Sequence, residues 1–113
     1  MTIVYIAHPI SGDVAGNLKL IVEIVRQINL EWTDVVPLVP YYVDLLALRD
    51  DVAEERQRGI DNDTAILRSG IINELWLYGR WATSKGCLAE MDLALDLGIT
   101  VVDMYYYKLK HLC

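Results

Sequence analysis

The sequence predicts a single-domain, three-layer α/β/α fold whose sheet has four or five strands, mostly parallel. Two observations predict this fold. Short apolar segments rich in β-branched residues alternate with longer segments in which apolar residues recur every three or four positions. The chain also has 113 residues, about the length of one domain, and a domain of this size buries a core without disulfides or metals. Such alternation is typical of Rossmann-like and flavodoxin-like domains, in which helices cover both faces of a parallel sheet.

The first part of the chain predicts a strand, a turn, a helix and a second strand. Thr2–Ala7 is apolar and β-branched, as expected of a strand buried on both faces. It ends at residues 8–12, where a proline and a glycine indicate a turn. A weaker strand is expected over residues 34–39 and ends at Pro40. The intervening helix is predicted from apolar residues that share one face, namely Leu18, Ile21, Val22, Val25 and Ile28.

The middle of the chain predicts two helices. Residues 44–58 have a helical pattern, and Gly59 is expected to break it. A shorter helix that reaches about Arg68 is expected next. Asp61 or Asn62 would cap its N-terminus, because both residue types accept hydrogen bonds from the first free N–H groups of a helix.

The last third of the chain predicts a strand, a helix and a final strand. The first strand is expected over residues 71–78, closed by a glycine, and the last over residues 99–104. Between them, residues 84–97 have the strongest helical pattern, and Gly98 is expected to cap that helix. An edge strand or a contact between subunits is indicated by three adjacent aromatic residues, Tyr105, Tyr106 and Tyr107.

The composition excludes several classes of protein. Hydrophobic residues make up 54% of the chain, which excludes a disordered or low-complexity protein. The net charge of −6 repels phosphate backbones, so we expect no nucleic acid partner. We also expect a cytoplasmic protein without membrane contact, because no segment has the pattern of a bilayer-spanning helix or a secretory leader. Cys87 and Cys113 form neither a disulfide framework nor a metal-binding spacing, and we expect no metal and no cofactor.

The predicted topology also locates a ligand site. In open parallel sheets, ligands bind beyond the carboxyl ends of the strands, near the point where the strand order reverses. We therefore expect residues 8–12 and residues 79–86, which follow the first and third strands, to lie together. The first of these loops leads into a helix N-terminus, which favours an anion. Ser11 and Gly12 suit that contact, but Asp13 disfavours phosphate, so an ordinary turn is an equally good interpretation.

Glu90 is the most informative polar residue in the sequence. A helix turns about 100° per residue, so Glu90 shares the apolar face of the predicted helix with Leu93 and Ala94. A buried, unpaired carboxylate is costly, and burial raises its pKa. Glu90 is therefore either bonded to a tyrosine or a backbone N–H, or kept for a chemical task. Gly86 lies one turn earlier on the same face and leaves room for a flat ligand.

Three other residues are weaker candidates. Asp63 lies near the start of the predicted short helix, where capping is the favoured interpretation and a second functional carboxylate is the alternative. Trp81 lies in a polar loop and suits stacking on a base better than the other aromatic residues do. His8 is a packed turn residue, a ligand contact or a general acid.

Several of these residues together resemble one superfamily. The motifs are Tyr5-Ile-Ala-His-Pro-Ile-Ser-Gly12, then Asp63, Trp76-x-Tyr-Gly-x-Trp81, Ser84-x-Gly86 and Gly86-x3-Glu90-x3-Ala94-x3-Gly98. In this order they resemble the nucleoside 2-deoxyribosyltransferase-like proteins, and most closely a small (DUF4406-like) branch found in bacteria and phages. The resemblance extends from Thr2 to about Val102. It implies a single domain of this type over residues 1–113.

The resemblance implies specific roles for the site residues. Glu90 matches the nucleophile that attacks the anomeric carbon, Asp63 the carboxylate that helps protonate the leaving base, and Tyr5 the tyrosine that orients the nucleophile. A turn matching the one that contacts the sugar 5′ end or a 5′-phosphate consists of His8, Pro9, Ile10, Ser11 and Gly12. The remaining substrate-binding candidates are Gly79, Trp81, Ser84 and Gly86.

We therefore expect an enzyme that acts on the N-glycosidic bond of a small-molecule nucleoside or nucleotide, as a hydrolase or a deoxyribosyltransferase.

The sequence departs from the family in several ways. The groups with which the transferases recognise the base have no identified counterparts in this sequence. The chain is short, and Ile71 or a neighbour replaces an aspartate of some relatives. One alternative is a non-catalytic, nucleotide-binding or signal-sequestering module, which a phage would use against host nucleotide metabolism. A structural protein that has lost the site is another alternative. A homo-oligomer is expected from the mean hydropathy of +0.27.

Overall fold

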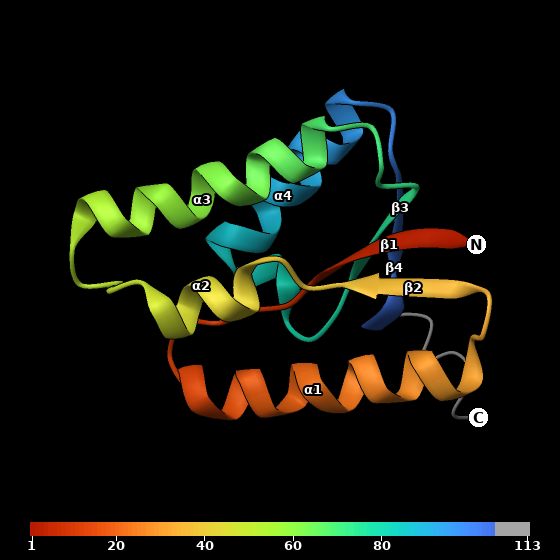
Figure 1. Cartoon of the computed structure of the whole chain (residues 1–113), viewed down its shortest axis with the longest axis horizontal. Helices are drawn as coiled ribbons and strands as arrows, with labels where there is room; N and C mark the ends of the chain where they lie inside the picture. Colours follow the sequence, from red (N-terminus) through yellow and green to blue (C-terminus); the bar gives the residue numbers. More distant parts are fainter. Residues whose placement is uncertain (106–113) are drawn as a thin grey trace.

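The computed structural model describes residues 1–105 and contains a four-stranded, all-parallel sheet with the strand order β2-β1-β3-β4 (Figure 1). The strands are β1 (Thr2–Ala7), β2 (Val35–Leu38), β3 (Glu74–Leu77) and β4 (Thr100–Asp103). The helices are α1 (Val14–Glu31), α2 (Tyr41–Ala47), α3 (Ala53–Arg68) and α4 (Lys85–Asp96), with a short 3-10 helix η1 (Trp81–Thr83). The predicted three-layer α/β/α fold is confirmed.

Helices cover both faces of the sheet, with α1 on one side and α3 and α4 on the other (Figure 1). Side chains alternate along β1, because successive strand residues point to opposite faces. Val4 belongs to the same buried cluster as Ile28 of α1, whereas Tyr5 belongs to the cluster that contains Leu67 of α3 and Ala94 of α4. Both faces of β1 are therefore buried, as its apolar sequence predicts.

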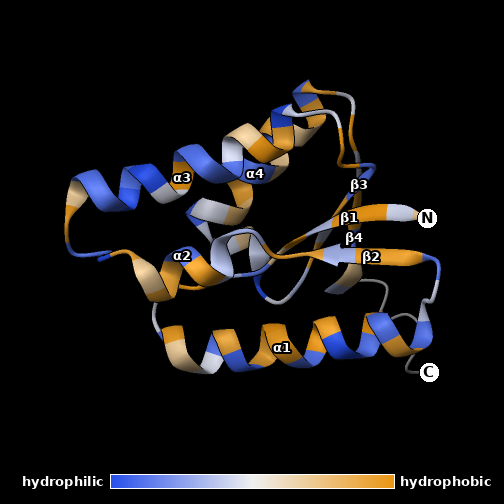
Figure 2. Cartoon of the chain, in the orientation of Figure 1, coloured by the Kyte–Doolittle hydropathy of each residue, from blue (hydrophilic) through white to orange (hydrophobic). Residues whose placement is uncertain are grey.

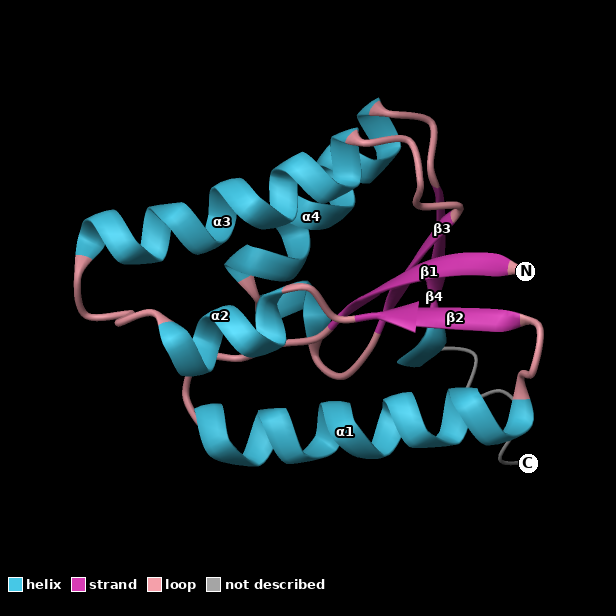
Figure 3. Ribbon diagram, viewed as in Figure 1, coloured by secondary structure: helices cyan, strands magenta, loops and turns pink. Residues whose placement is uncertain are grey.

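The strand order reverses between β1 and β3. From β1 the chain crosses to β2 on one side, and later returns to β3 on the other side of β1. Ala7 at the end of β1 pairs with Leu77 at the end of β3, so the loops after these two strands start side by side. In Figure 3 the arrowhead of β2 points toward α2, at the same carboxyl edge of the sheet.

The helical region between β2 and β3 differs from the prediction. Gly59 does not break a helix, because α3 runs through it from Ala53 to Arg68. A glycine inside a helix costs only about 1 kcal/mol relative to alanine, which continuous hydrogen bonding and packing offset here. The break lies instead after α2, where Leu48 is extended. Figure 2 shows that α3 is mostly hydrophilic, in contrast to β1.

Three other helix ends are capped, and of these the cap at Gly98 was predicted. The side chain of Asp13 accepts a hydrogen bond from the backbone N–H of Gly16 and caps α1, and Ser84 caps α4 in the same way through the N–H of Cys87. Gly98 follows α4 with a φ of +75°, the left-handed conformation expected of a C-terminal cap. The helix η1 within residues 79–86 was not predicted.

Two further expectations concern the surface and the chain end. Within residues 1–105, no helix combines the length and the apolar character needed to cross a membrane. The predicted edge strand or subunit contact falls largely on Tyr106 and Tyr107, which lie outside the described residues.

Candidate functional site

The loops after β1 and β3 are in close contact at the carboxyl edge of the sheet. Gly79 has a φ of +61°, and a Cβ atom there would lie 3.3 Å from Cδ of Pro9 and 3.5 Å from Nε2 of His8. A glycine is therefore favoured at this position both by the backbone conformation and by the approach of the neighbouring loop. The prediction that residues 8–12 and 79–86 lie together is confirmed.

Internal hydrogen bonds fix the turn after β1. Nδ1 of the buried His8 lies 2.7 Å from the carbonyl oxygen of Pro9, and the amide of Asn17 donates to the carbonyl oxygen of Ile10 at 2.9 Å. Burial lowers the pKa of His8, so its imidazole is neutral at pH 7. Ser11 and Gly12 are exposed at the tip of the turn. The turn thus presents hydroxyl and backbone groups to solvent, and His8 helps to shape it.

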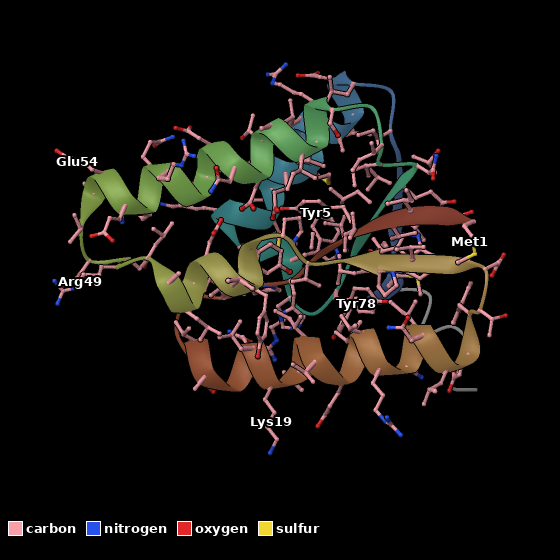
Figure 4. The ribbon with its side chains drawn as sticks, in the orientation of Figure 1. Met1, Tyr5, Lys19, Arg49, Glu54 and Tyr78 are labelled. Carbon is pink, nitrogen blue, oxygen red and sulfur yellow. The ribbon has the colours of Figure 1, made fainter. Side chains whose placement is uncertain are left out.

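Tyr5 and Glu90 form the centre of the candidate site. Tyr5 is fully buried in β1, and its hydroxyl donates a hydrogen bond to Oε2 of Glu90 on α4. Figure 4 places Tyr5 in the interior of the fold. Glu90 is half-buried, so part of its side chain stays exposed. Of the two alternatives for Glu90, the structure shows a carboxyl group bonded to a tyrosine, which is also the arrangement implied for an oriented nucleophile.

The electrostatics of Glu90 follow from these surroundings. Burial raises the pKa of Glu90 to about 8, the negative charge of Asp63 acts in the same direction, and the hydrogen bond from Tyr5 opposes both. Burial also raises the pKa of Tyr5, with further contributions from Glu90 and Asp63, so its phenol stays neutral and acts as a donor. At pH 7, therefore, the phenol of Tyr5 is protonated and the carboxyl group of Glu90 is more often protonated than ionised.

Asp63 is not a helix cap. It lies well inside α3, so the favoured interpretation from the sequence was wrong, because the helix already begins at Ala53 and not after Asp61 or Asn62. Oδ1 of Asp63 is buried and has no hydrogen-bond partner. It is the one such side-chain nitrogen or oxygen atom within residues 1–105. Burial and the nearby charge of Asp44 raise the pKa of Asp63 to about 7. Asp61 and Asn62 likewise lie inside α3, and the residue before its first turn, Val52, makes no side-chain cap.

A small cavity of about 100 Å³ opens between α2 and α3 beside Asp63. Its polar lining includes Asp44, whose Oδ2 accepts a hydrogen bond from the amide of Asn62 at 3.1 Å. The remaining wall is formed by residues from the two helices and their connection, namely Tyr41, Leu45, Leu48, Asp50, Glu55, Arg56, Gly59 and Ile60. A larger apolar groove of about 250 Å³ runs between α1 and β2 and contains none of these carboxyl groups.

Tyr41 and Asp44 are site residues that the sequence reasoning missed. The ring of Tyr41 lies 6.1 Å from that of Tyr5, and its hydroxyl donates to the carbonyl oxygen of Ile6 at 2.7 Å. One signal could have found both residues. They follow the carboxyl end of β2, so the rule that selected the loops after β1 and β3 applies to them as well.

The remaining candidates lie around this centre. Ser84 serves as the N-cap of α4, and a Cβ atom at the exposed Gly86 would meet only Oγ of Ser84 at 4.0 Å. Trp81 packs against the core and donates its indole N–H to Asp103 of β4 at 3.1 Å, so this ring is held by the sheet. Burial raises the pKa of Cys87 to about 11, which makes its thiol a packing group rather than a nucleophile at neutral pH.

The site therefore combines an oriented carboxyl group with a second carboxyl group that has an unpartnered oxygen. The turn of accessible backbone follows β1, the strand that carries Tyr5. In the described part of the chain, no three His, Cys, Asp or Glu side chains are grouped so as to hold a metal ion. The two carboxyl groups suit acid–base and nucleophilic chemistry.

The chain matches the model of a protein family. No curated protein and no solved structure matches the chain. A family model described as "Domain of unknown function (DUF7768)" matches residues 2–104, which include every site residue described above. The match covers most of the chain, and the protein therefore belongs to the DUF7768 family.

Proposed function

We propose that this protein cleaves the N-glycosidic bond of a nucleoside or nucleotide, as a hydrolase or a deoxyribosyltransferase, with Glu90 as the nucleophile. The observation that carries the proposal is the hydrogen bond from Tyr5 to Glu90 at the carboxyl edge of the sheet, beside the point where the strand order reverses. The resemblance to the nucleoside 2-deoxyribosyltransferase-like proteins supports it, because it assigns the same pair of residues to the nucleophile and its orienting partner.

The reaction would proceed through two displacements. In the first, the Glu90 carboxylate bonds to the anomeric carbon, the bond from that carbon to the base nitrogen breaks, and the base takes a proton from Asp63. In the second, water or an acceptor base bonds to the anomeric carbon, the bond to Glu90 breaks, and the incoming group returns a proton to Asp63. Each displacement inverts the configuration, so the product retains it.

The protonation states set the working pH of such a site. Glu90 must be ionised and Asp63 protonated at the start of the reaction. With the pKa of Glu90 near 8 and that of Asp63 near 7, this state is a minor fraction of the free protein. The hydrogen bond from Tyr5 stabilises the ionised form of Glu90 and increases that fraction.

The substrate would lie across the edge of the sheet. Gly86 leaves the space next to Glu90 open, and the exposed tip of the turn at Ser11 and Gly12 suits the 5′ end of the sugar. Asp63 and the cavity between α2 and α3 would then face the base. Each of these contacts is one that a small-molecule nucleoside or nucleotide would make.

The test is an incubation of the full chain with ribo- and deoxyribonucleosides and their 5′-monophosphates, with and without an acceptor base. Products are separated by liquid chromatography, and intact-protein mass spectrometry looks for a sugar bound to the protein. We expect free base or a new nucleoside from the native protein, and neither from Glu90→Gln. Asp92→Asn is the matched control, because it removes an exposed carboxylate from the same helix.

Each outcome of this experiment has a defined meaning. Free base without acceptor identifies a hydrolase, and a new nucleoside that needs acceptor identifies a transferase. Full activity in Glu90→Gln would refute the role of Glu90. The absence of product from every compound would refute the proposed enzymatic activity.

A second candidate function is a nucleotide-binding module without turnover. The observation that favours it is the raised pKa of Glu90, because a neutral carboxylic acid at pH 7 donates a hydrogen bond to a ligand better than it attacks a carbon atom. Mass spectrometry of small molecules released from the purified protein separates the two functions. An intact nucleotide with no product supports binding alone, whereas free base or a sugar phosphate supports catalysis.

A further inference from the structure

Asp44 and Asp63 are two carboxyl groups that line one cavity from opposite helices. Asp44 lies on α2 and Asp63 on α3, and both line the cavity of about 100 Å³ between these helices. Figure 1 shows α2 and α3 as neighbours, joined by a short connection at one end. The amide of Asn62 donates to Oδ2 of Asp44 at 3.1 Å, so one oxygen of Asp44 has a fixed partner on α3.

Asp63 has no such partner for Oδ1, although this atom is buried. A buried oxygen of an ionised carboxylate without a hydrogen bond is costly, and a proton on the group reduces this cost. Asn62 is next to Asp63 in the sequence, but its amide serves Asp44. Asp44 therefore has a hydrogen-bond donor, the amide of Asn62, whereas Oδ1 of Asp63 has none.

Charged and titratable groups from several elements surround Asp63. The cavity beside it is lined by Tyr41 and Asp44 of α2, Asp50 of the connection, and Glu55 and Arg56 of α3. The charge of Asp63 also acts on Tyr5 of β1 and Glu90 of α4. Among these groups, the charge that acts on Asp63 is chiefly that of Asp44, and it adds to the effect of burial by disfavouring ionisation. Glu90 and Asp63 disfavour each other's ionisation as well, because the charge of Asp63 raises the pKa of Glu90.

We infer that Asp44 is a positioning residue: anchored by Asn62, it holds a negative charge beside Asp63 so that Asp63 keeps its proton until the base leaves. The inference rests on the proposed function, in which Asp63 is the proton donor. The O–H bond of Asp63 breaks as the bond from the anomeric carbon to the base nitrogen breaks, and the base nitrogen takes the proton. The incoming water or acceptor base later returns one proton to Asp63.

The test measures the proton on Asp63 directly, without relying on turnover. The carboxyl carbon of Asp63 is followed by NMR as a function of pH in the full chain and in Asp44→Asn, whose side-chain oxygen can still accept from Asn62. We expect the midpoint of the Asp63 titration to fall by about one pH unit or more, the size of shift that a nearby charge produces. Asp44→Ser is a second variant, with a smaller side chain and the same loss of charge.

Glu55→Gln is the matched control, because Glu55 lines the same cavity and its side-chain oxygen accepts from the backbone N–H of Arg49, which glutamine also permits. We expect little change in the Asp63 midpoint in this variant. A midpoint that stays unchanged or rises in both Asp44 variants would overturn the inference.

Activity gives an independent readout. In Asp44→Asn, the maximum of kcat/KM should fall. The acid-side break of its pH profile, which reports the lower pKa of Asp63, should move to lower pH by the same amount as the NMR midpoint. An unmoved profile would overturn the role of Asp44 in the reaction. A fall of the NMR midpoint together with no turnover in the native protein would instead refute the proposed function, and the catalytic role of the pair with it.

Discussion

The hydroxyl of Tyr5 donates a hydrogen bond to the carboxyl group of Glu90, although 85 residues separate them in the sequence. Tyr5 lies on the central strand β1, and Glu90 lies on α4, the helix that follows β3. The bond therefore joins the two sides of the point where the strand order reverses. It also gives Glu90 a neutral partner, so the carboxyl group is oriented without being neutralised by a cation.

Replacing Tyr5 with phenylalanine should impair this orientation while preserving the fold. The hydrogen bond lowers the pKa of Glu90, so its loss should raise that pKa and reduce the ionised fraction at pH 7. Under the proposed function, we expect kcat/KM at pH 7 to fall by about 10- to 100-fold, the range for a hydrogen bond to a charged group worth about 1.5–3 kcal/mol. The basic-side break of the pH profile, which reports the higher pKa of Glu90, should move to higher pH. Unchanged activity and an unchanged break would contradict the role of Tyr5.

The stability of the protein should depend on pH through Glu90. Its pKa is raised from about 4.5 in the unfolded chain to about 8 in the folded protein, so the folded state holds its proton more tightly. The contribution of Glu90 to stability is therefore greatest below about pH 4.5 and falls as the pH rises toward 8, because Glu90 of the unfolded chain loses its proton first. Asp63, with a pKa of about 7, acts in the same direction.

Glu90→Gln tests this dependence. Glutamine cannot ionise and can still accept a hydrogen bond from Tyr5. We expect it to raise the melting temperature at pH 8 by several degrees and to have little effect at pH 5, since about 1 kcal/mol shifts the melting temperature by about 4 °C in a domain of this size. Calorimetry at both pH values measures the difference. Equal shifts at pH 5 and pH 8, or the same pH 8 shift in Asp92→Asn, would contradict the assignment.

Gly79→Ala should separate the two loops at the edge of the sheet. The residue has a φ of +61°, and the added Cβ atom would lie 3.3 Å from Cδ of Pro9. Gly70→Ala is a matched control, because Gly70 also has a positive φ, +87°, but a Cβ atom there meets nothing within 4 Å. Both variants incur the left-handed backbone cost of about 1–2 kcal/mol. We expect chemical denaturation to show that Gly79→Ala loses about 1 kcal/mol more. Equal losses would mean that the contact with Pro9 relaxes freely.

Asp13 should make the site prefer a nucleoside to its 5′-monophosphate. Its carboxylate accepts from the N–H of Gly16 and lies over the N-terminus of α1, where a phosphate would otherwise be favoured. The turn at residues 8–13 contains no lysine or arginine. We expect each of the four 2′-deoxynucleosides to bind more tightly than its monophosphate in calorimetry.

Asp13→Ser provides the comparison, because serine also caps helices but carries no charge. The preference for the nucleoside should shrink by about two- to fivefold, as expected for a charge interaction of about 0.3–1 kcal/mol at an exposed helix end. A native protein that binds the monophosphate more tightly would contradict the prediction.

Part of the site could be predicted because it follows from local patterns and topology. The alternation of strands and helices placed residues 8–12 beside residues 79–86, and the structure confirms the contact through Gly79 and Pro9. Helical periodicity placed Glu90 on a face that cannot be fully solvated. These conclusions need only the repeat of each element and the rule for parallel sheets.

The error at Gly59 shows where local patterns fail. A glycine raises the cost of a helix by about 1 kcal/mol, and packing of α3 against α2 offsets that cost. The mistaken break then misplaced Asp63 as a cap. As a result, the sequence reasoning missed the cavity between α2 and α3 and the hydrogen bond from Asn62 to Asp44.

By itself, the sequence determined the layers of the fold, the edge of the sheet that carries the site, and the presence of a carboxyl group on the buried face of α4. The resemblance already implied Tyr5 as the partner of Glu90. Only the tertiary structure decided that their side chains meet in a hydrogen bond, and that Asp63, with an unpartnered oxygen, lines one cavity with Asp44. The physical reason is the range of the forces involved. Periodicity reflects burial within one element, whereas hydrogen-bond partners, desolvation and the charges that act on a carboxyl group depend on how distant segments pack together.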